Sequence, residues 1–309
     1  MRKLEELEED VGGYVLRAMN YDALLQRLRE RLGSSPLAAF SDQILACATP
    51  SIAASCEPRL EDSSGSRVGG FPDLPPAHPW PRCDGSPLEF LGQIKLTELA
   101  GFAGAQVLPQ SGTLSFFFHS AAIPSEREQS SERGRIFWFA EDSKLTRSEP
   151  PADCAPLFRV HPEKTVVWTQ RCDVPDFEEM DSDEFATVPA VYRVVPPNLR
   201  LAYGEFRDAI CGRYVRSKML GAPDSVQGGE VKFDAIFRTD TSNRYRYEDY
   251  TWTNEEELRS KMRSLRLLMQ ATGEDGGLWG GTEVIHFWID EASLAAHRFD
   301  RAFATAQTT

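Results

Sequence analysis

The stretch GGFPDLPPAHPWPRCDGSPLEFLGQI, residues Gly69–Ile94, decides the fold class of this 309-residue chain. Its first half, Gly69–Pro81, contains five prolines, which remove backbone donors and fix φ. Neither a helix interior nor a central strand can therefore run through it. Phe71, Leu74 and Trp80 are too apolar for a solvated linker. We predict a rigid loop that these three side chains hold against the core.

A strand pattern begins where the prolines end. In Pro87–Leu99 (PLEFLGQIKLTEL) the side chains alternate up to Ile94, and a short helix is expected near Thr97. Other runs typical of strands are 51–60, Gly112–Phe118, Arg135–Ala140 and Lys164–Gln170. Together with the helical segments, these strands predict an α+β protein.

The first 50 residues are predicted to be an N-terminal helical segment. Apolar residues recur at helical spacing at Tyr21, Leu24, Leu25, Leu28 and Leu32. Asn20 or Asp22 can cap this helix and Gly33 can end it. Further helices are expected over 36–48, near Leu201–Lys218, and from Thr253 or Asn254 towards Arg266.

Two half-length copies of one pattern can be aligned in the chain, either through an internal duplication or through chance matches of short motifs. In the first half, Gly70-Phe71-Pro72-Asp73 precedes Phe90-Leu91-Gly92-Gln93 and then Gly112–Phe117. In the second half, Gly221-Ala222-Pro223-Asp224 precedes Leu267-Leu268-Met269-Gln270 and then Gly281–Trp288. We expect two related, intimately packed halves, 51–170 and 200–309, with Gln93 and Gln270 on equivalent strands.

The same motifs resemble those of the YwqG-like family, bacterial proteins without an established biochemical function. The motifs are Gly69–Pro75, Trp80-Pro81, Pro87–Ile94, Leu108-Pro109, Gly112–Phe117, Leu220–Asp224, Gln227-Gly228, Leu267–Gln270, Trp279-Gly280 and Phe287–Ile289. The resemblance implies one domain over 51–309 with a mainly antiparallel β-sheet. Some relatives lie beside secreted-toxin genes, which implies an immunity-like or toxin-associated partner role. The family supplies no catalytic residues.

Composition restricts the kinds of partner. With 47 Asp and Glu against 34 Lys and Arg, the net charge of -13 repels nucleic acid and anionic membrane surfaces. The six cysteines are dispersed, without a CxxC pair, and are interpreted as reduced thiols. The N-terminus is acidic where a signal peptide is apolar, and no run of 18 apolar residues occurs. We expect a cytoplasmic protein.

Several residue groups in the sequence are candidates for a reaction centre. His78, Cys83 and Asp84 lie close in sequence, as a nucleophile and its base require, but an ordinary polar loop is the favoured interpretation. The five histidines are solitary and predict no metal site. His119 and His286 border aromatic strands in roughly matching places of the two halves. The glycines of 276–281 lack a Walker lysine and favour a turn. No cofactor is predicted.

The side-chain amides of Gln93 and Gln270 fall inside apolar strands and need hydrogen-bond partners. They can line a groove between the halves or satisfy the backbone of the proline-rich loops, and the second interpretation is favoured. The full set of groove or loop-holding candidates is Trp80, Gln93, Gln227, Gln270 and Trp279.

Residues 171–187 form an acidic insert, interpreted as an exposed loop. It is either a solvated loop or a surface that attracts a cationic partner and then contacts it through apolar side chains. The candidate partner-binding residues are Asp176, Phe177, Glu178, Glu179, Asp181, Asp183 and Glu184.

The leading expectation from the sequence is a non-catalytic protein-binding module with a basic protein partner. An immunity-like neutraliser of a toxin is its most concrete form. The alternative is a small-molecule-binding or hydrolytic enzyme with a cleft between the two halves, using Cys83 or a Gln/His pair.

Overall fold

The computed structural model describes residues 20–59, 65–119, 133–154, 160–175, 195–211, 217–226, 231–239, 247–248, 251–273 and 283–308. Within these residues a ten-stranded sheet has the order β16-β15-β14-β11-β1-β10-β2-β6-β7-β8, with neighbours antiparallel. Its strands are β1 (Thr49–Pro58), β2 (Arg67–Val68), β6 (Glu89–Lys95), β7 (Thr113–Phe118), β8 (Gly134–Phe139), β10 (Lys164–Asp173), β11 (Lys218–Met219), β14 (Leu265–Thr272), β15 (Glu283–Asp290) and β16 (Phe303–Thr308). The predicted α+β class and mainly antiparallel sheet are confirmed.

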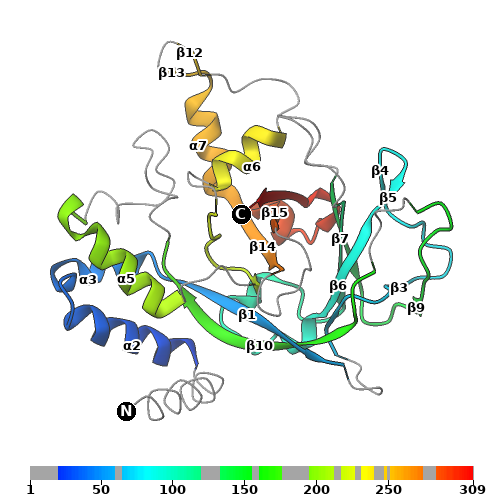
Figure 1. Cartoon of the computed structure of the whole chain (residues 1–309), viewed down its shortest axis with the longest axis horizontal. Helices are drawn as coiled ribbons and strands as arrows, with labels where there is room; N and C mark the ends of the chain where they lie inside the picture. The colour runs from blue at the N-terminus through cyan, green and yellow to red at the C-terminus, as the bar shows by residue number, and fades with distance from the viewer. Residues whose placement is uncertain are drawn as a thin grey trace.

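The long strands β1 and β10 form the centre of the sheet and cross the lower part of the molecule in Figure 1. Their register runs from Thr49 opposite Asp173 to Pro58 opposite Lys164. The acidic insert was predicted to begin at Arg171, and this was wrong, because β10 continues through Asp173. Asp173 is buried rather than exposed, since a lysine from β11 neutralises it.

The sheet has the same order when followed outward from either central strand. From β1 the neighbours are β11, β14, β15 and β16, and from β10 they are β2, β6, β7 and β8. The two arms therefore correspond strand by strand. The second strand of each copy pairs with the first strand of the other, because β10 pairs with β2 and β1 pairs with β11. By this correspondence the second copy starts at β10, earlier than residue 200.

Individual backbone contacts repeat in the two arms. Arg67 lies opposite Gln93, and Lys218 lies opposite Gln270. Just before each glutamine the pairing with the next strand is irregular, at Phe90/Gly92 and at Leu267/Met269. Equivalent hydrogen bonds are Gly69 N to Leu91 O (2.8 Å) with Leu220 N to Leu268 O (3.1 Å), and Lys95 N to Ser66 Oγ (2.9 Å) with Thr272 N to Ser217 Oγ (3.0 Å). The copies share hydrogen-bond patterns as well as strand order.

The main core lies on one face of this sheet, which curls until its outer strands approach each other. Phe116 of β7 and Phe287 of β15 are at equivalent positions and meet edge to face, with ring centroids 5.1 Å apart. A Cβ on Gly134 of β8 would collide with Ala304 of β16. The two copies thus bury their apolar faces against each other.

The opposite face of each arm has a different cover. In the first copy, Phe90 and Phe117 pack against Leu74, Leu88 and the half-buried Trp80 of the proline-rich segment. That segment contains β3 (Asp73–Leu74), β4 (Arg82–Cys83) and β5 (Ser86–Pro87), and β3 pairs with β9 (Thr146–Arg147). The predicted loop is therefore ordered and packed on the core.

In the second copy two helices cover the equivalent face. Leu267 and Trp288, which correspond to Phe90 and Phe117, pack against α6 (Val231–Thr239) and α7 (Glu255–Ser264). The sequence predicted the start of α7, but its N-cap Asn254 makes no side-chain capping hydrogen bond. A short hairpin of β12 (Tyr247–Glu248) and β13 (Thr251–Trp252) precedes α7.

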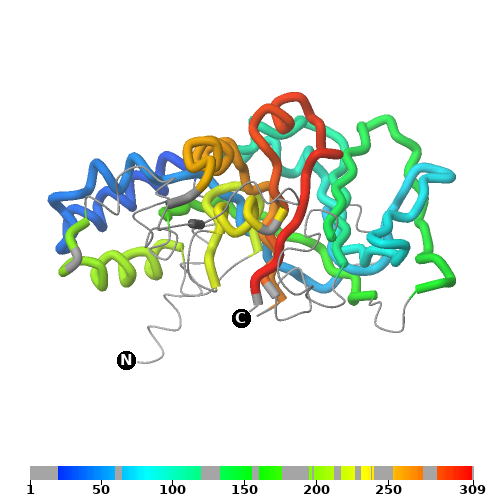
Figure 2. The backbone as a smooth tube through the Cα atoms, turned by 90° about the horizontal axis from the view of Figure 1, so that it is seen from above, coloured from blue at the N-terminus to red at the C-terminus, as the bar shows by residue number. Residues whose placement is uncertain are grey.

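Another group of helices lies at one end of the molecule, while β3 and β9 lie at the other end, in both views (Figures 1 and 2). The group contains α2 (Tyr21–Gly33), η1 (Ala38–Phe40), α3 (Ser41–Ala46), η6 (Pro197–Leu199) and α5 (Arg200–Cys211). They pack around Leu28, Leu32 and Tyr203 against the end of β10.

The ends of these helices follow their capping residues only in part. Helix α2 has the predicted limits, and Asn20 accepts a hydrogen bond from Ala23 N. The helix expected over Leu201–Lys218 was wrong at its end, because Lys218 belongs to β11.

In the described part of the chain, no helix is both long and apolar enough to cross a membrane. The remaining short elements are η2 (Leu96–Glu98), η3 (Ala105–Val107), α8 (Glu291–Ala295) and η7 (Phe299–Arg301).

Candidate functional site

The side chain of Gln93 connects the sheet to the proline-rich loop. Its Oε1 accepts a hydrogen bond from Asp73 N (2.8 Å), and its Nε2 donates to Asp73 O (2.7 Å) and to Ser115 Oγ (2.7 Å). Gln93 is buried, so these bonds replace those it would make with water. The side-chain amide of Gln93 therefore bonds both the N–H and the C=O of Asp73, as the backbone of a neighbouring strand would. These bonds hold the loop at Asp73.

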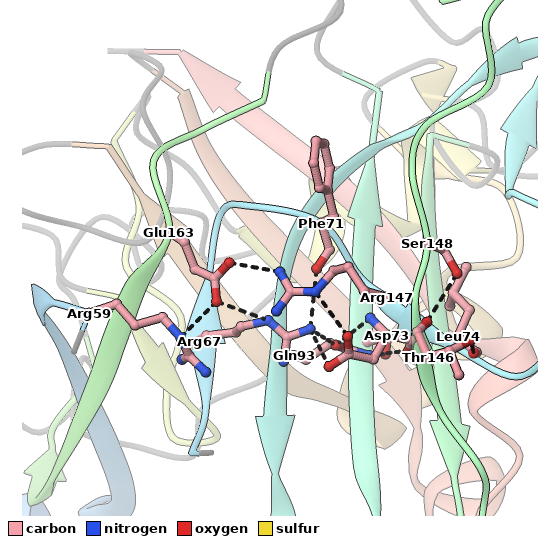
Figure 3. Close-up of polar contacts among 11 residues, drawn as sticks. Arg59, Arg67, Phe71, Asp73, Leu74, Gln93, Thr146, Arg147, Ser148 and Glu163 are labelled. Atoms are coloured by element: carbon pink, nitrogen blue, oxygen red, sulfur yellow. Dashed lines mark hydrogen bonds and ion pairs between the residues drawn. The ribbon is translucent and has the colours of Figure 1, made fainter. Parts of the chain in front are cut away.

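Arg67 reaches the same point from β2. Its Nη2 donates to Gln93 Oε1 (2.5 Å), to Asp73 Oδ2 (2.6 Å) and to the carbonyl oxygen of Phe71 (3.2 Å). Figure 3 shows the guanidinium of Arg67 at the centre of these contacts. A charge this deeply buried requires charged partners, and Asp73 supplies the first.

Three further residues complete what we name the Arg67 cluster. Arg147 Nε lies 3.0 Å from Asp73 Oδ1, and its Nη1 lies 2.7 Å from Glu163 Oε2. Arg59 Nε lies 2.7 Å from Glu163 Oε1. The cluster thus joins three arginines and two carboxylates from β2, β3, β9 and the loops beside β1 and β10 (Figure 3).

The backbone before Asp73 has a conformation that favours glycine. Gly69 and Gly70 have φ values of 70° and 65°. A Cβ on Gly69 would overlap the carbonyl oxygen of Pro162, and one on Gly70 would overlap Glu163. The two glycines therefore let the loop pass close to the residues that precede β10.

The second copy has an equivalent group, which we name the Lys218 cluster. Lys218 Nζ lies 2.8 Å from Asp173 Oδ2 and 3.0 Å from Asp224 Oδ2. Arg207 Nη2 lies 2.6 Å from Asp224 Oδ1, and Ser51 Oγ donates to Asp173 Oδ1 (2.7 Å). Lys218 is at the position of Arg67 and Asp224 at that of Asp73.

Gln270 occupies the position of Gln93 in this cluster. Its Oε1 accepts from Asp224 N (2.8 Å), and its Nε2 donates to Asp224 Oδ2 (2.8 Å). His286 occupies the position of Ser115, and its Nε2 donates to Asp224 O (3.1 Å). Both copies thus fix the aspartate of a Pro-Asp pair through a buried glutamine.

Burial and neighbouring charges shift the pKa values of the ionisable groups in the Lys218 cluster in different directions. Burial alone would lower the pKa of Lys218, but the attraction of Asp173 and Asp224 outweighs it and raises that pKa. Burial would raise the pKa of Asp224, but Lys218 and Arg207 hold it at about 2. Burial lowers the pKa of His286 to about 4. At neutral pH the carboxylate and amine are therefore charged and the imidazole is neutral.

His119 and His286, expected in roughly matching places of the two halves, are not at equivalent positions. His286 corresponds to Ser115, because both lie opposite the buried glutamine of their copy. His119 lies past the end of β7, where burial lowers its pKa. Among the described residues, no group of three or more His, Cys, Asp or Glu side chains could hold a metal ion.

His78 and Cys83 both border the apolar cluster beneath the proline-rich loop. The His78 ring meets Phe137 and Phe139 edge to face, at centroid distances of 4.8 and 5.6 Å. Cys83 is buried in the apolar cluster beneath the proline-rich loop. None of the six cysteines, all of which lie in the described part of the chain, forms a disulfide. Burial raises the pKa of Cys172 to about 12 and that of Cys211 to about 11, which keeps these thiols protonated.

The remaining sequence candidates divide into two groups. Trp80 packs edge to face on Phe117 at 5.8 Å, and its Nε1 donates to Leu88 O (2.9 Å). Gln227, Trp279, the glycines of 276–281 and the seven partner-binding candidates of 176–184 lie outside the described residues. Trp80, Gln93 and Gln270 are thus the candidates whose contacts can be described, and each bonds to loop or strand backbone.

Sequence reasoning missed the charged members of both clusters, although one signal for them was present. The repeated motif extends further upstream than Gly70 and Gly221. Ser66-Arg67-Val68-Gly69-Gly70-Phe71-Pro72-Asp73 aligns without a gap with Ser217-Lys218-Met219-Leu220-Gly221-Ala222-Pro223-Asp224. A cation three residues before the shared glycine marks each cluster. Arg147 and Glu163, by contrast, belong to no repeated motif and carry no such signal.

Both clusters lie inside one region that a family model recognises. The model, described as a domain of unknown function (DUF1963), matches residues 66–307. The chain belongs to this family. The DUF1963 region begins at Ser66, next to Arg67, and ends in β16, so it contains the second strand and outer strands of both copies. Helix α2 and strand β1 precede it. No curated protein gives a match to the chain.

Proposed function

We propose that this chain is a non-catalytic protein-binding module of the YwqG-like kind whose partner presents a basic surface. The observation that carries the proposal is the concentration of acid in a protein of net charge -13. Six acids of residues 176–184 are interleaved with Phe177 and Met180 in the segment between β10 and η6. Such a segment attracts a cationic surface over long range and then contacts it through apolar side chains.

The two clusters support a binding scaffold. Their arginine, lysine and carboxylate groups are paired with one another, and their glutamines are bonded to loop backbone. A reaction centre needs groups whose protonation state or nucleophilicity is poised for substrate. The clusters instead use their charges to fix two loops, and the raised pKa values of Cys172 and Cys211 keep these thiols protonated.

The most concrete form of the proposal is an immunity-like protein that neutralises a cationic toxin. Masking a basic surface requires a rigid scaffold and an acidic contact, and rigidity lowers the entropy lost on binding. Cytoplasmic residence is part of the proposal, and six cysteines without a disulfide suit a reducing compartment.

The test uses the full chain as bait in extract from its own cells, at low and at physiological salt. A protein that is retained stoichiometrically is then purified, and its association is measured by biolayer interferometry. Two triple variants are compared: Asp181→Asn/Asp183→Asn/Glu184→Gln within the segment, and Asp142→Asn/Glu149→Gln/Asp208→Asn at exposed acids elsewhere.

We expect the first variant to slow association at least about tenfold at low salt and the second to change it little. Equal slowing in both variants would assign the effect to total charge and remove the segment from the site. Failure to retain a stoichiometric partner at either salt concentration would refute the binding function itself.

A further inference from the structure

A cavity of about 440 Å³ lies where the N-terminal helix meets the end of the central sheet. Helix α2 contributes Leu24, Arg27, Glu30, Arg31 and Ser34, while β10 contributes Arg171 and Cys172, and the last turn of α5 contributes Ala209 and Ile210. The volume is in the range of pockets that bind small organic molecules. Neither charge cluster described above shares a residue with it.

The cavity is basic although the protein as a whole is acidic. Among the described residues that line it, three carry a guanidinium and one, Glu30, carries a carboxylate. Arg27 and Arg31 are four residues apart and so lie on one face of α2, where like charges repel. A concave surface with apolar walls concentrates such a field and attracts anions.

Two of the three arginines have a structural role that leaves donors unused. Arg31 Nη1 donates to Ala209 O (2.9 Å) and Arg171 Nη2 donates to Ile210 O (3.0 Å), so both bind the last turn of α5. A guanidinium has five N–H donors, and these bonds occupy one on each side chain. In the described part of the chain, Arg27 makes no hydrogen bond or ion pair. Helix capping therefore explains Arg31 and Arg171 but not Arg27.

We propose that this cavity binds a small organic anion, with a phosphate or carboxylate head that faces the arginines and a short apolar body. Arginine forks match the oxygens of both heads. The apolar body would contact Leu24, Ala209 and Ile210. Because α2 precedes the DUF1963 region, the site depends on the N-terminal segment of this chain, and its lining shares no residue with the protein-binding segment proposed above.

The probe is phenyl phosphate, with benzoate to distinguish a carboxylate from a phosphate head and phenol as the uncharged control. Binding to the full chain is measured by titration calorimetry at constant ionic strength, because screening weakens any charge interaction. The variant is Arg27→Gln. Arg29→Gln on the same helix is the matched control, since Arg29 is exposed and does not line the cavity.

We expect phenyl phosphate or benzoate to bind the wild-type chain and Arg29→Gln alike, phenol not to bind, and Arg27→Gln to bind the anion at least about tenfold more weakly. Circular dichroism verifies that both variants are folded. The proposal is overturned if neither anion binds at millimolar concentration, or if Arg27→Gln and Arg29→Gln bind it equally. Phenol binding as tightly as phenyl phosphate would also overturn it, since the arginines would then contribute nothing.

Discussion

Replacing Lys218 by methionine tests the Lys218 cluster most directly. The change removes the cation that lies 2.8 Å from Asp173 and 3.0 Å from Asp224 in the interior of the protein. Asp224 keeps Arg207, but Asp173 keeps Ser51 as its remaining partner in the cluster. Breaking a buried ion pair on one side costs about 3–5 kcal/mol of unfolding free energy. We expect Lys218→Met to lose stability in that range at pH 7.

Arg67→Met is the matched control because Arg67 is the equivalent residue of the first copy. Its two carboxylates, Asp73 and Glu163, retain Arg147 and are 29% and 23% exposed. Water and the remaining arginine therefore compensate, and the expected loss is roughly 1–2 kcal/mol. The structure thus predicts a larger loss at Lys218 than at Arg67.

The pH dependence of Lys218→Met follows from the same contacts. In the wild-type chain the pKa of Asp224 is about 2, below its unfolded value, so its contribution to stability is present at pH 7 and is lost as pH falls towards 2. A carboxylate deprived of Lys218 has a raised pKa when folded and takes up a proton more readily. The loss of stability should therefore be largest at pH 7 and smaller at pH 4.5.

Urea unfolding followed by circular dichroism and tryptophan fluorescence measures both effects, with linear extrapolation at each pH. The reasoning is refuted if Lys218→Met loses no more stability than Arg67→Met. A loss that stays the same between pH 7 and pH 4.5 would equally contradict an uncompensated buried carboxylate.

Two further predictions concern the backbone and the thiols. Gly69→Ala should lower the thermal midpoint and cost at least about 2 kcal/mol of unfolding free energy, because the new Cβ adds the strain of a positive φ to an overlap with Pro162. Gly204→Ala in α5 should instead gain about 0.5–1 kcal/mol of unfolding free energy, since a Cβ there has no atom within 4 Å. Scanning fluorimetry compares the two, and equal midpoints would contradict the strain argument. At pH 8, Cys172 and Cys211 should resist a thiol reagent until urea unfolds the chain, since burial raises their pKa values to about 12 and 11. Rapid labelling of either thiol in the folded protein, read by mass spectrometry, would show that it is ionised and accessible.

Local sequence patterns were sufficient for the strands and helices that have a clear apolar face. The stripe from Tyr21 to Leu32, with Asn20 before it and Gly33 after it, gives the limits of α2. The aromatic run before Phe118 gives β7, since aromatic side chains fill a pleated and buried surface. In these elements the residues that determine the structure are neighbours in sequence.

Local sequence patterns failed to place charged residues whose burial depends on an ion pair with a residue far away in the sequence. Asp173 has the composition of an acidic loop, yet it is a buried strand residue because Lys218 pairs with it across 45 positions. Lys218 in turn resembles the end of a basic helix. Neither residue can be placed without the other, and their contact depends on the packing of β1 between β10 and β11. Gln93 was a candidate because an amide in an apolar strand is conspicuous, whereas its charged neighbours are ordinary in the sequence.

The exchange of first strands between the copies determines how the molecule can come apart. The first strand of each copy, β1 or β10, pairs with the second strand of the other copy, as in a domain-swapped dimer. Here the two copies belong to one polypeptide. Neither copy can detach without leaving an open sheet edge in the interior of its twin. Unfolding should therefore be a single cooperative event across both copies. Two proteins made by cutting the chain between β9 and β10 should each be unstable alone and should regain structure when mixed.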